Sequence, residues 1–226
     1  MLLRCEMEAG AEGEQSGLAA SWLRTETFES LVELNEQCLE LFAEQAEVRA
    51  AQTNLLLRQI GELWRTLDAG ARRRAAACPY LLVDAGFADP HRWHAAAAHH
   101  VGDRELFSYI GFFTGGRAPG VARLAFTYAW YLARTHNADA RVILGMPAPC
   151  THAISACTLR QIHDLADRHP EWLKPRWPAR VKVWRALLLA AASGEGVALE
   201  RARLHGLRLL AAEARAAVMP ASGEIM

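Results

Sequence analysis

Residues 174–185 hold a dense group of side chains suited to binding anions. They contain five bases and no acid: Lys174, Arg176, Arg180, Lys182 and Arg185. Bases at this density neutralise phosphates, and they also attract acidic proteins. Three tryptophans are interleaved with them, at Trp172, Trp177 and Trp184. The stretch is therefore either a face that binds DNA or an acidic partner, or a helix junction whose tryptophans are core anchors under a basic outer side.

Other chemistry is weakly supported by the residue pattern. His91 and His94 are neighbours on a helix, but no acid follows either at helical spacing, and His99 and His100 point to other faces. Cys150 and Cys157 lack the second pair of a zinc site. No nucleophile motif or phosphate loop is present. We therefore expect a non-enzymatic protein with no catalytic residue, metal, cofactor or small-molecule substrate.

The composition predicts a folded all-α protein. About half of the 226 residues are hydrophobic, and alanine, leucine, arginine and glutamate dominate over β-branched runs. The apolar run 186–192 is too short to span a bilayer. The first residues lack the order of a signal peptide, and five cysteines form no disulfide framework. These features indicate a cytoplasmic protein without a membrane association.

The chain divides into three predicted parts. Residues 1–22 form a disordered acidic tail, residues 23–114 a helical N-terminal region, and residues 120–219 a helical C-terminal domain, with the boundary at the loop "TGGRAPG". Charge is unevenly distributed, since residues 1–68 hold 13 acids and 5 bases whereas residues 139–215 hold 12 bases and 7 acids. The two ends of the chain are thus expected to meet different partners, or each other.

Helix signals predict a multi-helix bundle of roughly eight helices. Apolar residues at three- and four-residue steps run from residue 26 to 67, which predicts one long acidic helix or two with a break near "AAQTN". Asp89 is placed to cap a helix that opens at Pro90, Thr158 opens another, and Pro178 opens the next. "PAP" at residues 147–149 is interpreted as a break. No strand is expected. The predicted core includes Trp130, Leu144, Leu159, Ile162, Leu165, Trp177 and Trp184.

Short motifs in the second half resemble a known regulator family. "LGM" at 144–146, "TLRQ" at 158–161, "LAD" at 165–167 and "RW" at 176–177 are similar, in order and spacing, to the D-component family of the flagellar master transcriptional activator. The resemblance covers about residues 125–215. Its carried-over positions are Leu144, Gly145, Thr158, Leu159, Gln161, Leu165, Ala166 and Arg176.

That resemblance implies an all-helical, dimerising regulator that acts on promoter DNA with a second subunit. The basic residues from Lys174 to Arg185, with Arg160 and Arg168 adjacent, are then expected to meet DNA or an acidic partner. The extra residues in front of the matched region and "HPEWLKP" depart from the family pattern.

A second resemblance competes with the first. The region from "TLRQI" to "RWP" is also similar to the K component of the type III secretion sorting platform. This family implies a cytosolic helical scaffold that holds other subunits. The alternative hypothesis is therefore a scaffold or adaptor with protein partners, or a self-associating protein.

Overall fold

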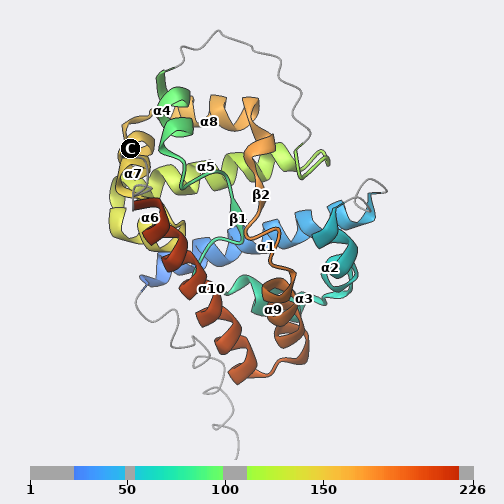
Figure 1. Ribbon diagram of the computed structural model, residues 1–226. Helices are drawn as coiled ribbons and strands as arrows, with labels where there is room; N and C mark the ends of the chain where they lie inside the picture. Colours follow the sequence, from blue (N-terminus) through green and yellow to red (C-terminus); the bar gives the residue numbers. More distant parts are fainter. Residues whose placement is uncertain (1–22, 49–53, 99–110, 219–226) are drawn as a thin grey trace, which may run out of the picture.

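The computed structural model describes residues 23–48, 54–98 and 111–218, and within them the protein is predominantly α-helical. Figure 1 shows these helices in two packed groups. The predicted acidic tail at residues 1–22 lies outside the described residues. The prediction of an all-α fold is confirmed.

Local capping explains where several helices begin. The first half contains α1 (Thr25–Glu47), α2 (Leu55–Thr66), α3 (Ala69–Ala76) and α4 (Pro90–Ala98). The Asn54 side chain accepts hydrogen bonds from the N–H groups of Leu56 and Leu57, and so caps α2. Asp68 caps α3 through the N–H of Ala71, and Asp89 caps α4 through the N–H of Arg92. Of the two alternatives for residues 26–67, the structure has two helices.

The second half contains α5 (Ala118–Thr135), α6 (Asn137–Ile143), α7 (Ala148–Ala156), α8 (Leu159–Arg168), a 3₁₀ turn (Pro170–Trp172), α9 (Val181–Ser193) and α10 (Gly196–Val218). Thr158 and Gln161 form a reciprocal capping box at the start of α8. The prediction of a helix start at Pro178 is wrong, because α9 begins at Val181. The break predicted at "PAP" is confirmed at Pro147, which is extended between α6 and α7, but Pro149 lies in the first turn of α7, where a missing N–H has no cost.

Two short strands are an addition to the predicted fold. Strand β1 (Val83–Asp84) pairs antiparallel with β2 (Lys174–Pro175), so that Val83 lies opposite Pro175 and Asp84 opposite Lys174. The expectation of no strand is therefore wrong. Figure 1 places this pair where the chain passes between the two helix groups.

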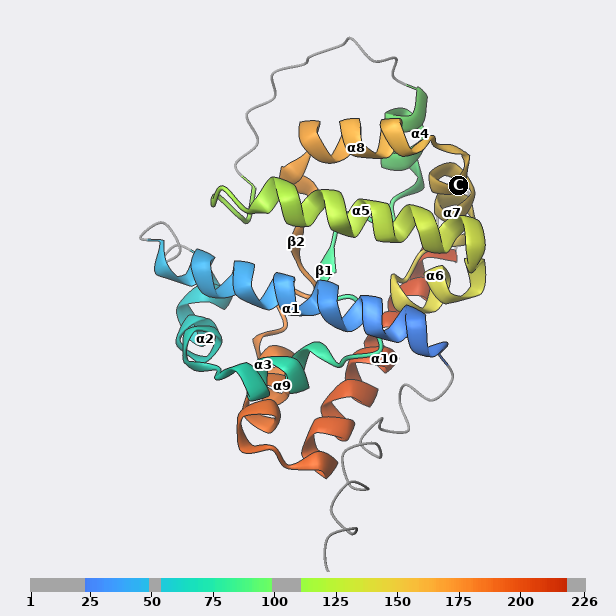
Figure 2. The same cartoon turned by 180° about the vertical axis from the view of Figure 1, so that it is seen from behind.

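The helices group by packing and not by their order in the chain. Helices α9 and α10 lie with α2 and α3 in one group, while α4 lies against α7 in the other. Helices α1 and α5 lie side by side between them, as seen from behind in Figure 2. One hydrophobic core includes residues from both sides of the loop at residues 114–120. The two regions separated by that predicted boundary thus share a core.

Aromatic and amide side chains hold the lower group together. Phe42, Trp64 and Trp184 come from α1, α2 and α9, and their ring centroids are 4.9–5.4 Å apart. Buried Asn35 of α1 donates through its Nδ2 atom to the carbonyls of Ala76 and Tyr80 at 2.9 and 3.0 Å. Because each polar group is paired, α1 fixes the segment after α3 at little desolvation cost.

Candidate functional site

The predicted basic stretch does not form one surface. Lys174 lies in β2 and forms an ion pair with Asp84 at 3.4 Å. Arg176 is buried. The three remaining bases, Arg180, Lys182 and Arg185, are exposed at the start of α9. The stretch thus has four exposed bases and not five, and one of the four, Lys174, is paired with Asp84.

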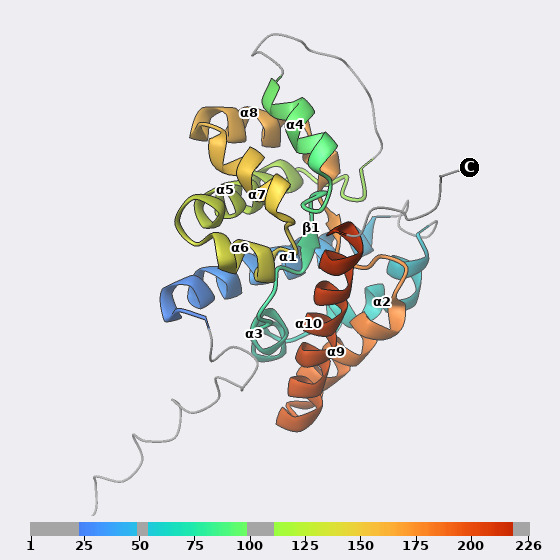
Figure 3. The same ribbon diagram turned by 60° about the vertical axis from the view of Figure 1, so that its left-hand side comes forward.

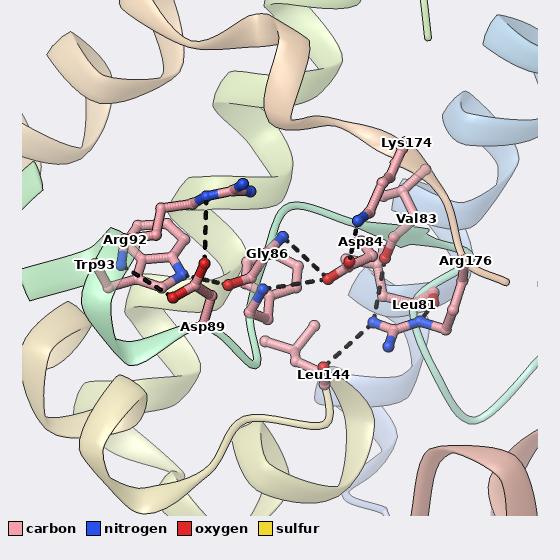
Figure 4. A network of polar contacts seen from close by, with 11 residues as sticks. Leu81, Val83, Asp84, Gly86, Asp89, Arg92, Trp93, Leu144, Lys174 and Arg176 are labelled. Carbon is pink, nitrogen blue, oxygen red and sulfur yellow. Dashed lines mark hydrogen bonds and ion pairs between the residues drawn. The ribbon is translucent and has the colours of Figure 1, made fainter. Parts of the chain in front are cut away.

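Arg176 is a buried connector of three chain segments, as Figure 4 shows. The residue is 4% exposed. Its Nε donates to the Leu81 carbonyl at 2.7 Å, and its Nη2 donates to the Val83 and Leu144 carbonyls at 3.2 Å each. Burial lowers the pKa of this guanidinium, an effect opposed by nearby acids, first among them Asp84. The expectation that Arg176 meets DNA or a partner is therefore wrong.

The tryptophans of the stretch belong to the interior. Trp177 and Trp184 are buried, and Trp184 Nε1 donates to the Arg176 carbonyl at 2.7 Å. Trp177 has a φ of 53°, a left-handed conformation that is costly for a bulky residue. Its ring packs edge-on against Tyr80 with centroids 5.4 Å apart. Packing therefore holds a strained backbone in place at this junction.

Arg160 and Arg168 lie on α8, in the other helix group from α9 (Figure 1). Arg160 is 4.0 Å from Asp164, and Arg168 Nε donates to the Asp164 carbonyl at 3.2 Å. The prediction that these two arginines adjoin the basic stretch is wrong for Arg180, Lys182 and Arg185, because α8 and α9 pack in different helix groups.

The predicted core residues are mostly interior. Leu144, Ile162 and Leu165 are buried, and Trp130 is partly buried with its Nε1 donating to the Cys157 carbonyl at 2.8 Å. Leu159 is 41% exposed, so its assignment to the core is wrong. It is the first residue of α8 and lies on the face turned to solvent.

The histidines and cysteines form no cluster in the described parts of the chain. His91 and His94 are exposed on α4, and the predictions for His99 and His100 fall outside the described residues. No group of three potential metal ligands occurs among described residues. The four described cysteines are free and buried, and burial raises the pKa of the Cys78 thiol to about 11. Such thiols are poor nucleophiles at neutral pH.

A cleft of about 1090 Å³ between α3 and the start of α10 is the strongest candidate site. We call it the arginine cleft. Figure 3 shows α10 beside α9 at the lower edge of the molecule. The cleft is lined by Gly70, Arg73, Arg74, Ala77, Gly194, Gly196, Val197, Leu199, Glu200, Arg201, Arg203, Leu204 and Arg208. Five of these residues are arginines, and the lining has a single acid.

The backbone around the cleft fixes two of its arginines. Gly194 ends α9 with a φ of 71°, a conformation that favours glycine. Arg74 Nε donates to the Ala191 carbonyl at 2.8 Å. Arg203 Nη2 donates to the Arg74 carbonyl at 2.9 Å. These hydrogen bonds hold α3, α9 and α10 together, so the inner wall of the cleft is preorganised for binding.

The rim of the cleft combines charge with apolar surface. Arg73, Arg201 and Arg208 are exposed, and none of them forms an ion pair in the part of the chain that the structure describes. Val197 is 70% exposed and Leu204 is 40% exposed. Exposed apolar side chains beside unpaired arginines suit a ligand that is both acidic and apolar.

Sequence reasoning missed this site because its two halves lie far apart in the chain. The signal that was available is on α10, where Val197, Arg201, Leu204 and Arg208 follow one another at steps of four, three and four residues. This spacing places them on one helix face. Nothing in the sequence shows that the "RRR" run at residues 72–74 packs against that face.

No protein-family model, curated protein or solved structure matches the chain. Among the helices described, none has both the length and the apolar character needed to cross a bilayer. The assignment of a function therefore depends on the arginine cleft and the exposed bases of α9.

Proposed function

We propose that this protein is a non-enzymatic adaptor that holds an acidic, amphipathic segment of a partner protein in the arginine cleft. The observation that carries the proposal is the lining of that cleft, with five arginines, one glutamate and two exposed apolar side chains. An acidic helix with leucines on one face has the complementary chemistry. The adaptor follows the second resemblance, in which a cytosolic helical scaffold holds other subunits.

The cleft is suited to specific binding because it combines arginines that are held in place by main-chain carbonyls with exposed arginines at its rim. Arg74 and Arg203 are immobilised by main-chain carbonyls, so ordering them costs little entropy on binding. The exposed rim arginines speed encounter with an acidic ligand, although each exposed ion pair contributes only about 0.2–1 kcal/mol. Val197 and Leu204 supply the apolar contact, at about 25 cal/mol per Å² of surface buried. Binding should therefore weaken with salt without vanishing.

A cytoplasmic location is part of this proposal. The four described cysteines carry free, buried thiols, which agrees with a reducing compartment.

The test is fluorescence anisotropy with a labelled synthetic helix of glutamates and leucines in amphipathic order. We expect Arg201→Glu/Arg208→Glu to weaken binding by about tenfold or more. Both residues are exposed, so the fold should persist, which circular dichroism checks.

The matched control is Arg160→Glu/Arg215→Glu, which makes the same charge change at two exposed residues outside the cleft lining. Equal losses in the two double variants would show general charge attraction and would refute the assigned site.

A transcriptional regulator that binds duplex DNA with a second subunit is the other candidate. The observation that favours it is the exposure of Arg180, Lys182 and Arg185 within the beginning of α9. Reversing all three to glutamate should abolish binding of a labelled duplex at low salt while leaving the helical signal intact. A duplex that binds equally to the wild type and to this variant would contradict a DNA-binding role for these residues.

A further inference from the structure

The inner wall of the arginine cleft contains a buried guanidinium, that of Arg203. Arg203 is 8% exposed. Its Nη2 donates to the Arg74 carbonyl at 2.9 Å, and its Nη1 lies 3.9 Å from Glu200. The Nε atom is buried and has no hydrogen-bond partner among described residues. A buried guanidinium is costly because it is removed from water, and negative charge bound in the cleft would offset part of that cost by Coulomb attraction.

The start of α10 opens into the same cleft. Gly194 and Gly196 both line it, and a Cβ atom built on Gly196 would meet no other atom within 4 Å. Apart from its chain neighbours and its own helix backbone, no part of the protein therefore crowds this position. The first N–H groups of a helix have no partner within the helix, and they carry partial positive charge. Anionic oxygens bind at such positions.

The positive charge of the arginines that line the cleft is larger than the charge of a single ligand carboxylate. Five guanidiniums face one carboxylate in the lining. A phosphate monoester carries nearly two negative charges on three acceptor oxygens, and it accepts paired hydrogen bonds from planar guanidiniums. We propose that the inner end of the arginine cleft, at Arg74, Arg203 and the start of α10, is a phosphate-monoester site. This inference rests on the proposed function, and its ligand is a phosphorylated serine or threonine in the acidic segment of the partner.

Isothermal titration calorimetry on the full chain tests the inference with three acidic, leucine-containing peptides. They are identical except at one central position, which is phosphoserine, glutamate or serine. The phosphoserine peptide should bind about tenfold more tightly than the glutamate peptide, since it adds charge and a third acceptor oxygen. Inorganic pyrophosphate should displace it.

Two variants locate the effect. Arg203→Lys keeps the charge but loses the planar fork, so it should reduce the preference for phosphoserine over glutamate while the glutamate peptide still binds. Because Arg203 also anchors α3 to α10, thermal unfolding checks that the Arg203→Lys variant is folded. The second variant is Arg201→Gln, at an exposed position. Arg201→Gln should weaken phosphoserine binding, whereas the exposed control Arg160→Gln on α8 should not.

The outcomes separate the two proposals. Equal affinity for the phosphoserine and glutamate peptides, with both lost in Arg201→Gln, would overturn the phosphate site and leave the adaptor. A phosphoserine preference that survives unchanged in Arg201→Gln and in folded Arg203→Lys would also overturn the site. Binding of pyrophosphate that Arg201→Gln weakens, without binding of any peptide, would support the phosphate site and refute the adaptor.

Discussion

Replacing Arg176 with methionine should destabilise the protein strongly although the residue lies in the stretch that looks like a binding surface. Methionine matches the length of the arginine stem but supplies no donor. The carbonyls of Leu81, Val83 and Leu144 would each lose a hydrogen bond from a charged group. These carbonyls lie before β1, within β1 and after α6, so the substitution removes the bonds by which Arg176 holds β1 and the end of α6 together.

The magnitude follows from two opposing terms. Each buried acceptor left without a partner costs about 1–3 kcal/mol, and three are affected. Removing a buried charge returns part of its desolvation cost, which is several kcal/mol for an isolated ion. The net expected loss is about 3–5 kcal/mol of the free energy of unfolding. For a chain of this size that corresponds to a fall in Tm of about 6–20 °C.

Urea unfolding followed by circular dichroism measures this loss. The control is Arg180→Met, which removes an arginine from the same stretch at an exposed position and should change stability by no more than about 0.5 kcal/mol. If Arg176→Met is as stable as Arg180→Met, the three hydrogen bonds do not hold the segments together and the connector role is refuted.

Three further predictions concern stability. Gly206→Ala should destabilise the protein by about 1–3 kcal/mol, because the added Cβ atom would overlap the phenol of Tyr80. The control Gly115→Ala has open space around it and should be neutral. Equal thermal stability of the two variants would contradict the close packing of α10. Trp177→Ala should cost about 3–5 kcal/mol as a buried aromatic truncation, and unchanged melting would show that its ring is not part of the core. Burial raises the pKa of the Cys78 thiol from 9.0 to about 11. As the pH rises, the unfolded chain therefore loses this proton before the folded one does, and the free energy of unfolding should fall between those two pH values. Urea titrations of Cys78→Ala should show a smaller fall, and a fall identical to that of the wild type would assign the effect to other groups.

Local signals in the sequence were enough to locate most helices. Asp89 and the Thr158–Gln161 pair are caps whose effect depends on residues within one turn, and the helices begin where these residues predict. Pro149 was misinterpreted because a proline both breaks a helix and favours its first turn. The start of α9 was misplaced because residues 177–180 form a turn, closed by the hydrogen bond from the Arg180 N–H to the Trp177 carbonyl.

The candidate site could not be derived from local patterns. Arg176 and Arg180 are four residues apart in one basic stretch, yet one is buried under three carbonyls and the other is exposed. Composition does not distinguish these environments, since burial of a charge depends on acceptors about 30 to 95 residues away in the chain. The arginine cleft also depends on contacts between residues far apart in the chain, because Arg74 and Arg203 meet only after α3 packs with α9 and α10.

The most direct test of the adaptor is hydrogen exchange measured with and without a saturating acidic, leucine-containing peptide. The account predicts added protection of backbone amides in residues 69–77 and 194–208, which form the two walls of the arginine cleft. The exposed start of α9 and all of α8 should be unchanged. Protection centred on residues 180–185, or on α8, with none at the cleft would contradict the central claim.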